Sequence, residues 1–516
     1  MSSTLDRLRR LHDAGKKSKP KKSQPSTSSR TAQPDHTSSF QEQRQSRHLE
    51  RDDKAWLLQE AVGGEELVNE EGCCYLVTHA YALDEQRGPD PFGTLLEHTP
   101  DLLSPFHPNF NLHSAAHFGS AAFIDTETTG LGGGAGVYTF MVGVGRFEAY
   151  THSLAPFEQK PSESKADASP SQLMSQQSAR LHYHRTNVQE VPPTHFVVRQ
   201  LFMRKPAEEL ALLVALNQLL SSCGMTVSFN GRTFDLPLLR TRYQQNQHLF
   251  RQLNQQTPPL LHEEMPHLDL LIPARRLWRR RLESCRLGWL EQQILGLQRT
   301  ADDVPGHMIP QLYNEYVRSG DLHQGQIPNI FYHNREDIAS MVPLAAQIYH
   351  PFHHHPHKSS PQTHTQKNQT STQSTADHGL DWLSLGCCFE SIGRLEEAES
   401  LWLRALKLLG NSPSELAGRM ETYRRLGQLY KRQEAWPQAT TIWQEWLSTD
   451  GELEPTPYVE LAKYCEWQTN DLEQAEMWTR WALHNLQQSP QRTGPMVQQI
   501  GQLEYRLARI VRKRNQ

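Results

Sequence analysis

Four acidic residues in three separated segments are the side chains of this chain best suited to chemistry. Asp125 and Glu127 lie in Phe-Ile-Asp-Thr-Glu-Thr-Thr-Gly-Leu, Asp235 ends Asn-Gly-Arg-Thr-Phe-Asp, and Asp337 ends Tyr-His-Asn-Arg-Glu-Asp. Gathered carboxylates repel one another unless a cation neutralises them. Hard divalent metals prefer such oxygen ligands. The pattern therefore predicts a site for two Mg²⁺ or Mn²⁺ ions that hydrolyses phosphodiester bonds.

The local sequence predicts how these side chains are presented. Asp125 and Glu127 are two residues apart on an extended segment, so both point to the same side of a strand. Asp235 begins a helix. His333 lies four residues before Asp337, on the same helical face. A neutral imidazole there is suited to activate the attacking water; a structural histidine is the alternative, and Asn334 is a second candidate for orienting water.

The elements that must position these residues span 119–350 and read as mixed α/β. Two apolar strands, a third strand, then alternating helix and strand are typical of a ribonuclease H-like mixed sheet flanked by helices. The expected strands are 121–125, 137–147, 195–203 and 226–229. The expected helices are 206–220, 233–246 and 334–348, with 267–318 largely helical.

The motifs resemble those of the DEDD superfamily of 3′–5′ exonucleases. Asp-Thr-Glu-Thr-Thr-Gly-Leu is similar to its first motif, and Asn230 through Asp235 to its second. The wider string, with His267-Leu-Asp-Leu-Leu, Asp303-Val-Pro-Gly and Tyr332-His-Asn, resembles the bacterial YprB-like ribonuclease H-like family. The family pattern places His five residues, or Tyr four residues, before the last Asp. Here that order is exchanged.

The resemblance implies a metal-dependent 3′–5′ exonuclease acting on single-stranded ends of DNA or RNA. It implies that Asp125, Glu127 and Asp337 hold one metal, and that Asp125 with Asp235 holds the other. Thr128 and Asn230 are implied to lie near the terminal nucleotide. A structure-specific endonuclease stays open within the enzyme class.

A dense basic stretch follows on an expected helix. It comprises Arg275, Arg276, Arg279, Arg280, Arg281 and Arg286. If it borders the acidic site, it would hold the phosphate backbone without reading sequence. A solvated helical face is the competing interpretation, and the sequence does not decide between them.

The whole chain has 516 residues and a net charge of −4. Composition indicates what the segments outside 119–350 are. Residues 1–53 are expected to be a disordered basic tail with a short helix, because nine Lys/Arg fall in the first thirty positions. The tail could contact phosphates or an acidic partner, or merely aid solubility. A lead-in segment that contains a strand at 74–79 and packs on the next domain is expected over 54–118. A polar insert is expected over 152–190, and a linker rich in His, Ser, Thr and Gln over 351–378.

Several classes are excluded by the sequence. No apolar run approaches the roughly 20 residues needed to cross a bilayer, and the N-terminus lacks a signal peptide. The seven cysteines do not form a disulfide framework or a zinc ribbon. These features predict a cytoplasmic protein without a membrane partner. The glycine loop after Glu127 lacks the Gly-Lys-Ser/Thr ending of a P-loop.

Residues 379–512 contain a helical repeat. Leu385-Gly386-x-x-Phe389 recurs as Leu426-Gly427-x-x-Tyr430 and Leu461-Ala462-x-x-Cys465. The spacing resembles tetratricopeptide repeats, in which small residues let paired helices approach. Trp446 stands where a small residue is expected, which predicts loose packing in the middle unit. Such repeats imply an unidentified protein partner, and with the exchanged His/Tyr order they favour a second hypothesis: a weakly active or inactive nucleic-acid-binding adaptor.

Overall fold

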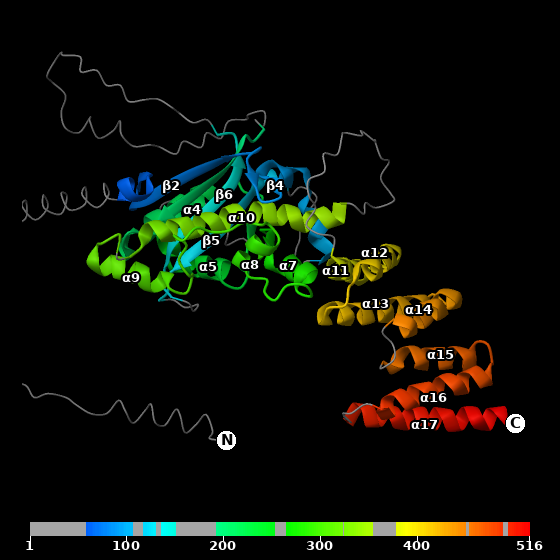
Figure 1. Ribbon diagram of the computed structural model, residues 1–516. Helices are drawn as coiled ribbons and strands as arrows, with labels where there is room; N and C mark the ends of the chain where they lie inside the picture. The colour runs from blue at the N-terminus through cyan, green and yellow to red at the C-terminus, as the bar shows by residue number, and fades with distance from the viewer. Residues whose placement is uncertain are drawn as a thin grey trace, which may run out of the picture. The chain divides into compact units, whose positions relative to one another are not determined.

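The computed structural model (Figure 1) describes residues 58–106, 117–130, 136–150, 192–252, 265–323, 325–353, 378–449, 454–488 and 494–516. The expected basic tail over 1–53 and the polar insert over 152–190 lie outside these residues. In the described ranges, no helix combines the length and the apolar character that crossing a membrane requires.

A seven-stranded mixed sheet forms the first part of the fold, in the order β1-β2-β7-β6-β5-β8-β9. The pairs from β1 through β5 are antiparallel, whereas β5–β8 and β8–β9 are parallel. The strands are β1 (Glu65–Asn69), β2 (Gly72–Ala82), β5 (Ala121–Thr128), β6 (Thr139–Glu148), β7 (His195–Phe202), β8 (Met225–Ser228) and β9 (His267–Asp269). This arrangement confirms the mixed sheet that the sequence predicts.

The sheet is wider than the sequence pattern indicates. The expected lead-in over 54–118 contributes β1 and β2, and β2 pairs with β7 from Tyr75–Phe202 to Ala82–His195. The span 267–318, expected to be largely helical, opens with the short strand β9, which continues the parallel edge beside β8. Strand β2 includes the strand expected at 74–79, whereas β1 and the three-residue β9 are recognisable only from their pairing.

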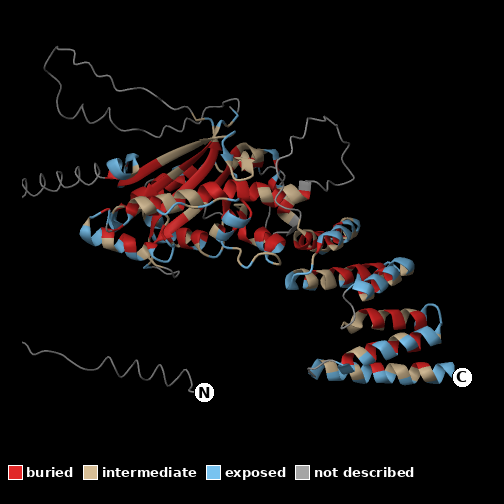
Figure 2. Cartoon of the chain, viewed as in Figure 1, coloured by how far each residue is buried: buried red, intermediate tan, exposed pale blue. Residues whose placement is uncertain are grey.

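Helices cover both faces of the sheet. Alternate residues of β5 enter two hydrophobic clusters, as the period-2 geometry of a strand requires: Ala121 and Phe123 pack in one, Ala122 and Ile124 in the other. The first cluster includes the apolar residues of the long helix α10 from Ile338 to Phe352, and Figure 1 shows this helix lying along the sheet. The second includes α4 and α9, and Figure 2 shows the strands between these layers as buried.

The helices of this part are α4 (Glu209–Leu220), α5 (Asp235–Gln245), α6 (Gln247–Gln252), α7 (Leu271–Trp278), α8 (Leu287–Gln293), α9 (Ile309–Ser319) and α10 (Ile327–His353). Short elements between β2 and β5 are β3 (Gln86–Arg87), β4 (Asp90–Pro91) and the 3₁₀ turns Phe92–Glu97, Pro100–Phe106 and Phe118–Ser120; another 3₁₀ turn, Pro206–Glu208, precedes α4. Helix α10 runs past both ends of the expected 334–348, and so into the first residues of the expected linker.

The C-terminal part is helical, as predicted. Its helices are α11 (Gly379–Ser391), α12 (Leu395–Leu408), α13 (Pro413–Arg432), α14 (Trp436–Thr449), α15 (Pro455–Trp467), α16 (Leu472–Gln488) and α17 (Gly494–Arg514). A Cβ on Gly386 or on Gly427 would lie 2.4 Å from the indole Nε1 of Trp402 or Trp443, so these glycines let the helices of a pair approach.

Trp446 does not loosen the middle unit, contrary to expectation. Its side chain is fully buried and stacks on Tyr423 with ring centroids 6.0 Å apart. The large ring fills space that a small residue would leave between helices, so the departure from the repeat pattern is accommodated by packing rather than by a gap.

Candidate acidic site on strand β5

Strand β5 presents the first two carboxylates on the face that α10 covers. Asp125 and Glu127 follow Phe123 at period 2, and Asp125 stands opposite Gly143 of β6. A Cβ at Gly143 would come within 2.0 Å of the Ile338 side chain and 2.4 Å of Asn334 Oδ1. Glycine at this position therefore lets α10 lie close enough to place its polar side chains against β5.

A chain of buried amides fixes Asp125. Asn334 Nδ2 donates to Asp125 Oδ2 at 2.7 Å, and Asn334 Oδ1 accepts from Gln200 Nε2 at 2.9 Å. Gln200 Nε2 also donates to the carbonyl of Phe331 at 2.8 Å. Both amides are fully buried. Asn334 thus orients the first carboxylate instead of facing open solvent.

Asp235 reaches the same strand from the first turn of α5. The hydroxyl of Thr126 donates to Asp235 Oδ1. A Cβ at Gly231 would lie 2.4 Å from Ser228 Oγ and 3.0 Å from Asp235 Oδ2, so the turn before α5 needs glycine there. The carboxyl end of β8 thereby delivers Asp235 to β5.

Asn230, a predicted substrate-binding residue, has a structural role in the described geometry. Its φ of 65° is left-handed, a conformation that Asn tolerates better than most residues. Its backbone N–H donates to Asp269 Oδ1 at 2.8 Å, and its side-chain oxygen accepts from Thr233. Thr128 at the end of β5 is the other predicted substrate-binding residue outside the basic stretch. It is buried and donates to the carbonyl of Gly130 at 2.7 Å.

The four carboxylates act on one another electrostatically. Burial and then the charges of Asp337, Glu127 and Asp235 raise the pKa of Asp125 well above its usual value. Burial, Asp337 and Asp235 do the same to the pKa of Glu127. Burial raises the pKa of Asp235 to about 6, against the hydrogen bond from Thr126. Mutual repulsion of this kind requires that the three segments meet.

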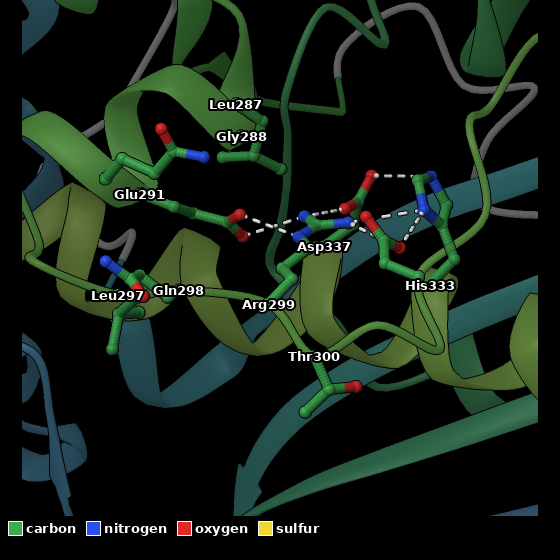
Figure 3. A pocket seen from close by; sticks show the side chains of 11 residues that line it. Leu287, Gly288, Glu291, Leu297, Gln298, Arg299, Thr300, His333 and Asp337 are labelled. Atoms are coloured by element: carbon green, nitrogen blue, oxygen red, sulfur yellow. Dashed lines mark hydrogen bonds and ion pairs between the residues drawn. The ribbon is translucent and has the colours of Figure 1, made fainter.

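Arg299, in the loop after α8, is the cation beside these groups (Figure 3). Its guanidinium binds Glu291 twice, at 2.7 and 2.8 Å, and forms a short ion pair with Asp337. Nη1 lies 3.4 Å from Asp303 Oδ1. Although burial opposes its charge, Asp337 and Glu291 raise the pKa of Arg299 above its usual value. One fixed positive charge therefore offsets Asp337.

His333 is held by Asp303. His333 Nδ1 lies 2.7 Å from Asp303 Oδ1, and Nε2 lies 3.8 Å from Asp337 Oδ2 (Figure 3). The same Nδ1 lies 3.2 Å from Arg299 Nη1, so an acceptor-only carboxylate and a donor-only guanidinium both face it. The shorter contact, to Asp303, pairs with the tautomer that carries the proton on Nδ1 and the lone pair on Nε2, the nitrogen on the side of Asp337. Tyr332, by contrast, accepts from the N–H of Thr300 at 3.0 Å and anchors that loop.

A cavity of about 500 Å³ adjoins these residues. It is lined by Leu287, Gly288, Glu291, Gln292, Leu297, Gln298, Arg299, Thr300, Asp303, His333 and Asp337. Its size is that of a small-molecule or nucleotide pocket. The predicted phosphate-binding residues Arg275, Arg276, Arg279 and Arg280 do not line it; they surround a different cavity.

The chemical type of these carboxylates suits a divalent ion, but in the described part of the chain their placement does not form a metal site. Within the described ranges, no group of three or more His, Cys, Asp or Glu side chains is placed so that it could hold a metal ion. In this structure Asp337 is engaged by Arg299 and Asp125 by Asn334. The donor set itself, all oxygen and mutually repelling, fits Mg²⁺ or Mn²⁺.

Three residues of this site are missed by reasoning from the sequence alone. Glu291, Arg299 and Asp303 come from α8 and the loop that follows it, far from the acidic motifs in sequence. Asp303 does fall in the Asp-Val-Pro-Gly string, which is part of the resemblance to the YprB-like family but does not assign a role to Asp303. Nothing in the local pattern assigns Arg299 to Asp337.

Comparisons with known proteins agree with this fold. Residues 186–349 match the RNase_H superfamily model, a range that includes Asp235, His333 and Asp337 but begins after β5. The chain therefore contains an RNase H-like domain, which indicates a nuclease-like or nucleic-acid-related activity. It is also 27% identical over 369 residues to the uncharacterized protein YprB of Bacillus subtilis (strain 168), covering 66% of this chain and 74% of that protein.

Proposed function

We propose that this protein is a divalent-metal-dependent 3′–5′ exonuclease of the DEDD type that hydrolyses phosphodiester bonds at single-stranded ends of DNA or RNA. The observation that carries the proposal is electrostatic: Asp235 of α5 and Asp337 of α10 lie close enough to Asp125 and Glu127 of β5 that, together with burial, they raise the pKa of both. Folding brings this uncompensated charge together at a free-energy cost that a bound cation would offset.

In this proposal Asp125, Glu127, Asp235 and Asp337 hold two Mg²⁺ or Mn²⁺ ions. Bound there, the ions would supply Lewis-acid stabilisation of the charge that grows on phosphate oxygens. Asp337 is then shared with Arg299, or released from it. Asn334 keeps the Asp125 carboxylate from rotating, since one of its oxygens accepts the amide proton.

The protein's own base would be His333. With Nδ1–H donated to Asp303, the lone pair on Nε2 is free to accept a proton from the attacking water. Asp303 holds the ring in this tautomer and stabilises the imidazolium that forms. The cavity lined by His333 and Asp337 would receive the terminal nucleotide, and Arg299 on its wall would face the substrate's phosphate.

The test is metal-dependent release of mononucleotides from an oligonucleotide labelled at its 3′ end. We expect release with Mg²⁺ or Mn²⁺ and none in EDTA. Asp125→Ala should lower the rate by at least about a thousandfold, since it removes a ligand and a positioned charge. A matched variant, Asp321→Ala, removes an exposed carboxylate outside the site and should retain the wild-type rate. Undiminished release from Asp125→Ala would exclude this site.

One observation favours a second candidate function. Arg299 already neutralises Asp337, as in a site that does not depend on a metal at that position. The domain would then bind nucleic-acid ends with little cleavage, while tetratricopeptide-type repeats over α11–α17 recruit a protein. Tight binding of a 3′ end without turnover across Mg²⁺, Mn²⁺, Co²⁺ and Zn²⁺ would favour this adaptor.

A further inference from the structure

The arginines at and after α7 divide into two groups. Arg280 and Arg281 are bound to the helical repeats. Arg280 contacts Glu421 of α13 at 2.9 Å and Ser384 of α11 at 3.4 Å. Arg281 contacts Asp381 of α11 at 2.9 Å through two nitrogens. These two side chains join the RNase H-like domain to the first repeat helices.

Arg275, Arg276 and Arg279 form the second group and are exposed. With Arg280 they line a cavity of about 240 Å³ whose other wall belongs to α11. That wall consists of Ser384, Cys387 and Cys388. We call this the junction cavity. Among the described residues that line it there is no carboxylate.

The thiols do not balance the arginines either. Burial raises the pKa of Cys387, and it raises the pKa of Cys388 to about 11. Both side chains are therefore neutral near pH 7. Three solvated guanidinium groups stand at one opening without an anionic wall, a distribution that concentrates positive potential there.

The spacing of these cations suits a ligand with several anionic groups in series. Arg275 and Arg279 are four residues apart, so they lie on one face of the helix, about 6 Å apart along its axis. Arg276 is their neighbour. Guanidinium groups bind phosphate oxygens through two parallel N–H donors, so three of them side by side can contact successive phosphates of one strand.

We propose that the junction cavity binds the phosphodiester backbone of a single-stranded nucleic acid, outside the acidic site and between the RNase H-like domain and the first repeat helix. The inference rests on the proposed function, because the ligand is the same strand whose end enters the acidic site. Arg275, Arg276 and Arg279 contact phosphates. Arg280 and Arg281 keep α11 in place as the opposite wall.

The experiment compares two triple variants of the full chain with equal charge change. Arg275→Gln/Arg276→Gln/Arg279→Gln alters the junction cavity. Arg318→Gln/Lys407→Gln/Arg512→Gln removes three exposed cations elsewhere and is the control. Binding of a fluorescent 20-nucleotide single strand is measured by anisotropy in EDTA over a range of salt concentrations, so that no turnover intervenes.

We expect the cavity variant to bind at least about tenfold more weakly at low salt. Its slope of log affinity against log salt should fall by about 2, because each phosphate contact on a single strand releases roughly 0.7 of a counterion. The control should change affinity less than about twofold. Equal losses in both variants, or none in the cavity variant, would overturn the inference.

Competition distinguishes the sources of the anion. Inorganic phosphate and a mononucleotide should displace the strand only at concentrations far above those of an unlabelled oligonucleotide. If either competes as well as the oligonucleotide, the cavity is a free-phosphate site. If polyglutamate of equal charge competes as well, the ligand is an acidic polypeptide. Either outcome contradicts the proposal.

Failure here can be separated from failure of the proposed function. Asp125→Ala should release no nucleotide, and adding the three cavity substitutions to it should weaken strand binding by the same factor as in the wild-type background. If the wild type hydrolyses strands and the cavity variant binds normally, this inference alone is wrong. If no hydrolysis occurs but the cavity variant binds weakly, the inference stands and the exonuclease proposal fails.

Discussion

Two carboxylate sites in this protein have pKa values shifted in opposite directions. In the repeats, Glu466 is fully buried as a side chain and accepts from Arg506, Arg509 and Lys513 of α17, at 2.7 to 3.1 Å. Burial alone would raise its pKa, but hydrogen bonds from Arg509 and Lys513 outweigh burial and hold the pKa below its usual value. On β5, Asp125 and Glu127 have raised pKa values.

The difference separates a carboxylate used for stability from one available for chemistry. Glu466 is matched by more positive charge than it carries, so it anchors α17 and has nothing left to bind. On β5, Glu127 has Arg299 as a neighbouring cation, and that residue is already engaged by Glu291 and Asp337. Residual negative charge in a partly closed site attracts a cation.

The largest effect should follow from removing the cation of the acidic site. Arg299→Gln leaves the buried Glu291 and the half-buried Asp337 without their partner, and we expect a loss of about 3–5 kcal/mol in the free energy of unfolding. Chemical denaturation in EDTA measures it. Arg335→Gln, which breaks a more exposed pair with Glu336, should cost less than about 1 kcal/mol. Equal losses would mean that Arg299 is not specially placed.

A second prediction concerns the base rather than the charge balance. His333→Asn should lower the rate of nucleotide release about a hundredfold, because it removes the nitrogen that accepts the proton. Tyr332→Phe, next to it, loses only the acceptor for the Thr300 N–H and should retain most of the activity. Rates are compared at saturating substrate and metal. If His333→Asn released nucleotides faster than Tyr332→Phe, His333 would not be the general base.

At the matched site, Glu466→Gln should destabilise the protein by about 2 kcal/mol, since three cations lose their common partner. The pKa of Glu466 is depressed in the folded state, so its contribution is present above the unfolded pKa and disappears as pH falls through the folded value. The difference between wild type and variant in urea denaturation should therefore shrink on going from pH 7 to pH 3.

At the acidic site the pH dependence of stability has the opposite sign to that of Glu466, and the expected effect is the smallest of the four. The pKa of Asp235 is raised to about 6, so its stability contribution is full below the unfolded pKa and is lost as pH rises through about 6. Asp235→Asn should then stabilise the metal-free protein by about 1 kcal/mol at pH 8 and leave it unchanged at pH 4. Denaturation in EDTA at both values checks this. A destabilised variant at pH 8 would contradict the repulsion.

The sequence predicts the parts of this fold that rest on local pattern. The strands β5, β6 and β7 and the helices α4 and α5 follow from apolar runs, and the mixed sheet follows from their order. Motif spacing also singles out Asp125 and Asp235, whose meeting at β5 shows in the Thr126 hydrogen bond and in the pKa shifts. These features depend on residues near one another in the chain.

What could not be predicted depends on tertiary placement. Arg299 reaches Asp337 from a loop 38 residues earlier, and no local periodicity reports such a pairing. The arginines in α7 and just after it form one basic stretch in the sequence, yet Arg280 and Arg281 bind the repeats while Arg275, Arg276 and Arg279 stay exposed. Strand β9 is three residues long, too short for a pattern to reveal.

The Gln200–Asn334–Asp125 chain makes the orientation of a single amide decide the polarity of the site. Asn334 presents its NH₂ to Asp125 because Gln200 occupies its oxygen with a donor. Were that amide reversed, two oxygens would face each other across the strand. Gln200, on β7, thus decides that Asp125 accepts a hydrogen bond from Asn334, although Gln200 does not contact Asp125 itself. Replacing Gln200 with Glu would remove the donor to Asn334 and so change the hydrogen bonding of Asp125 through that one intervening residue.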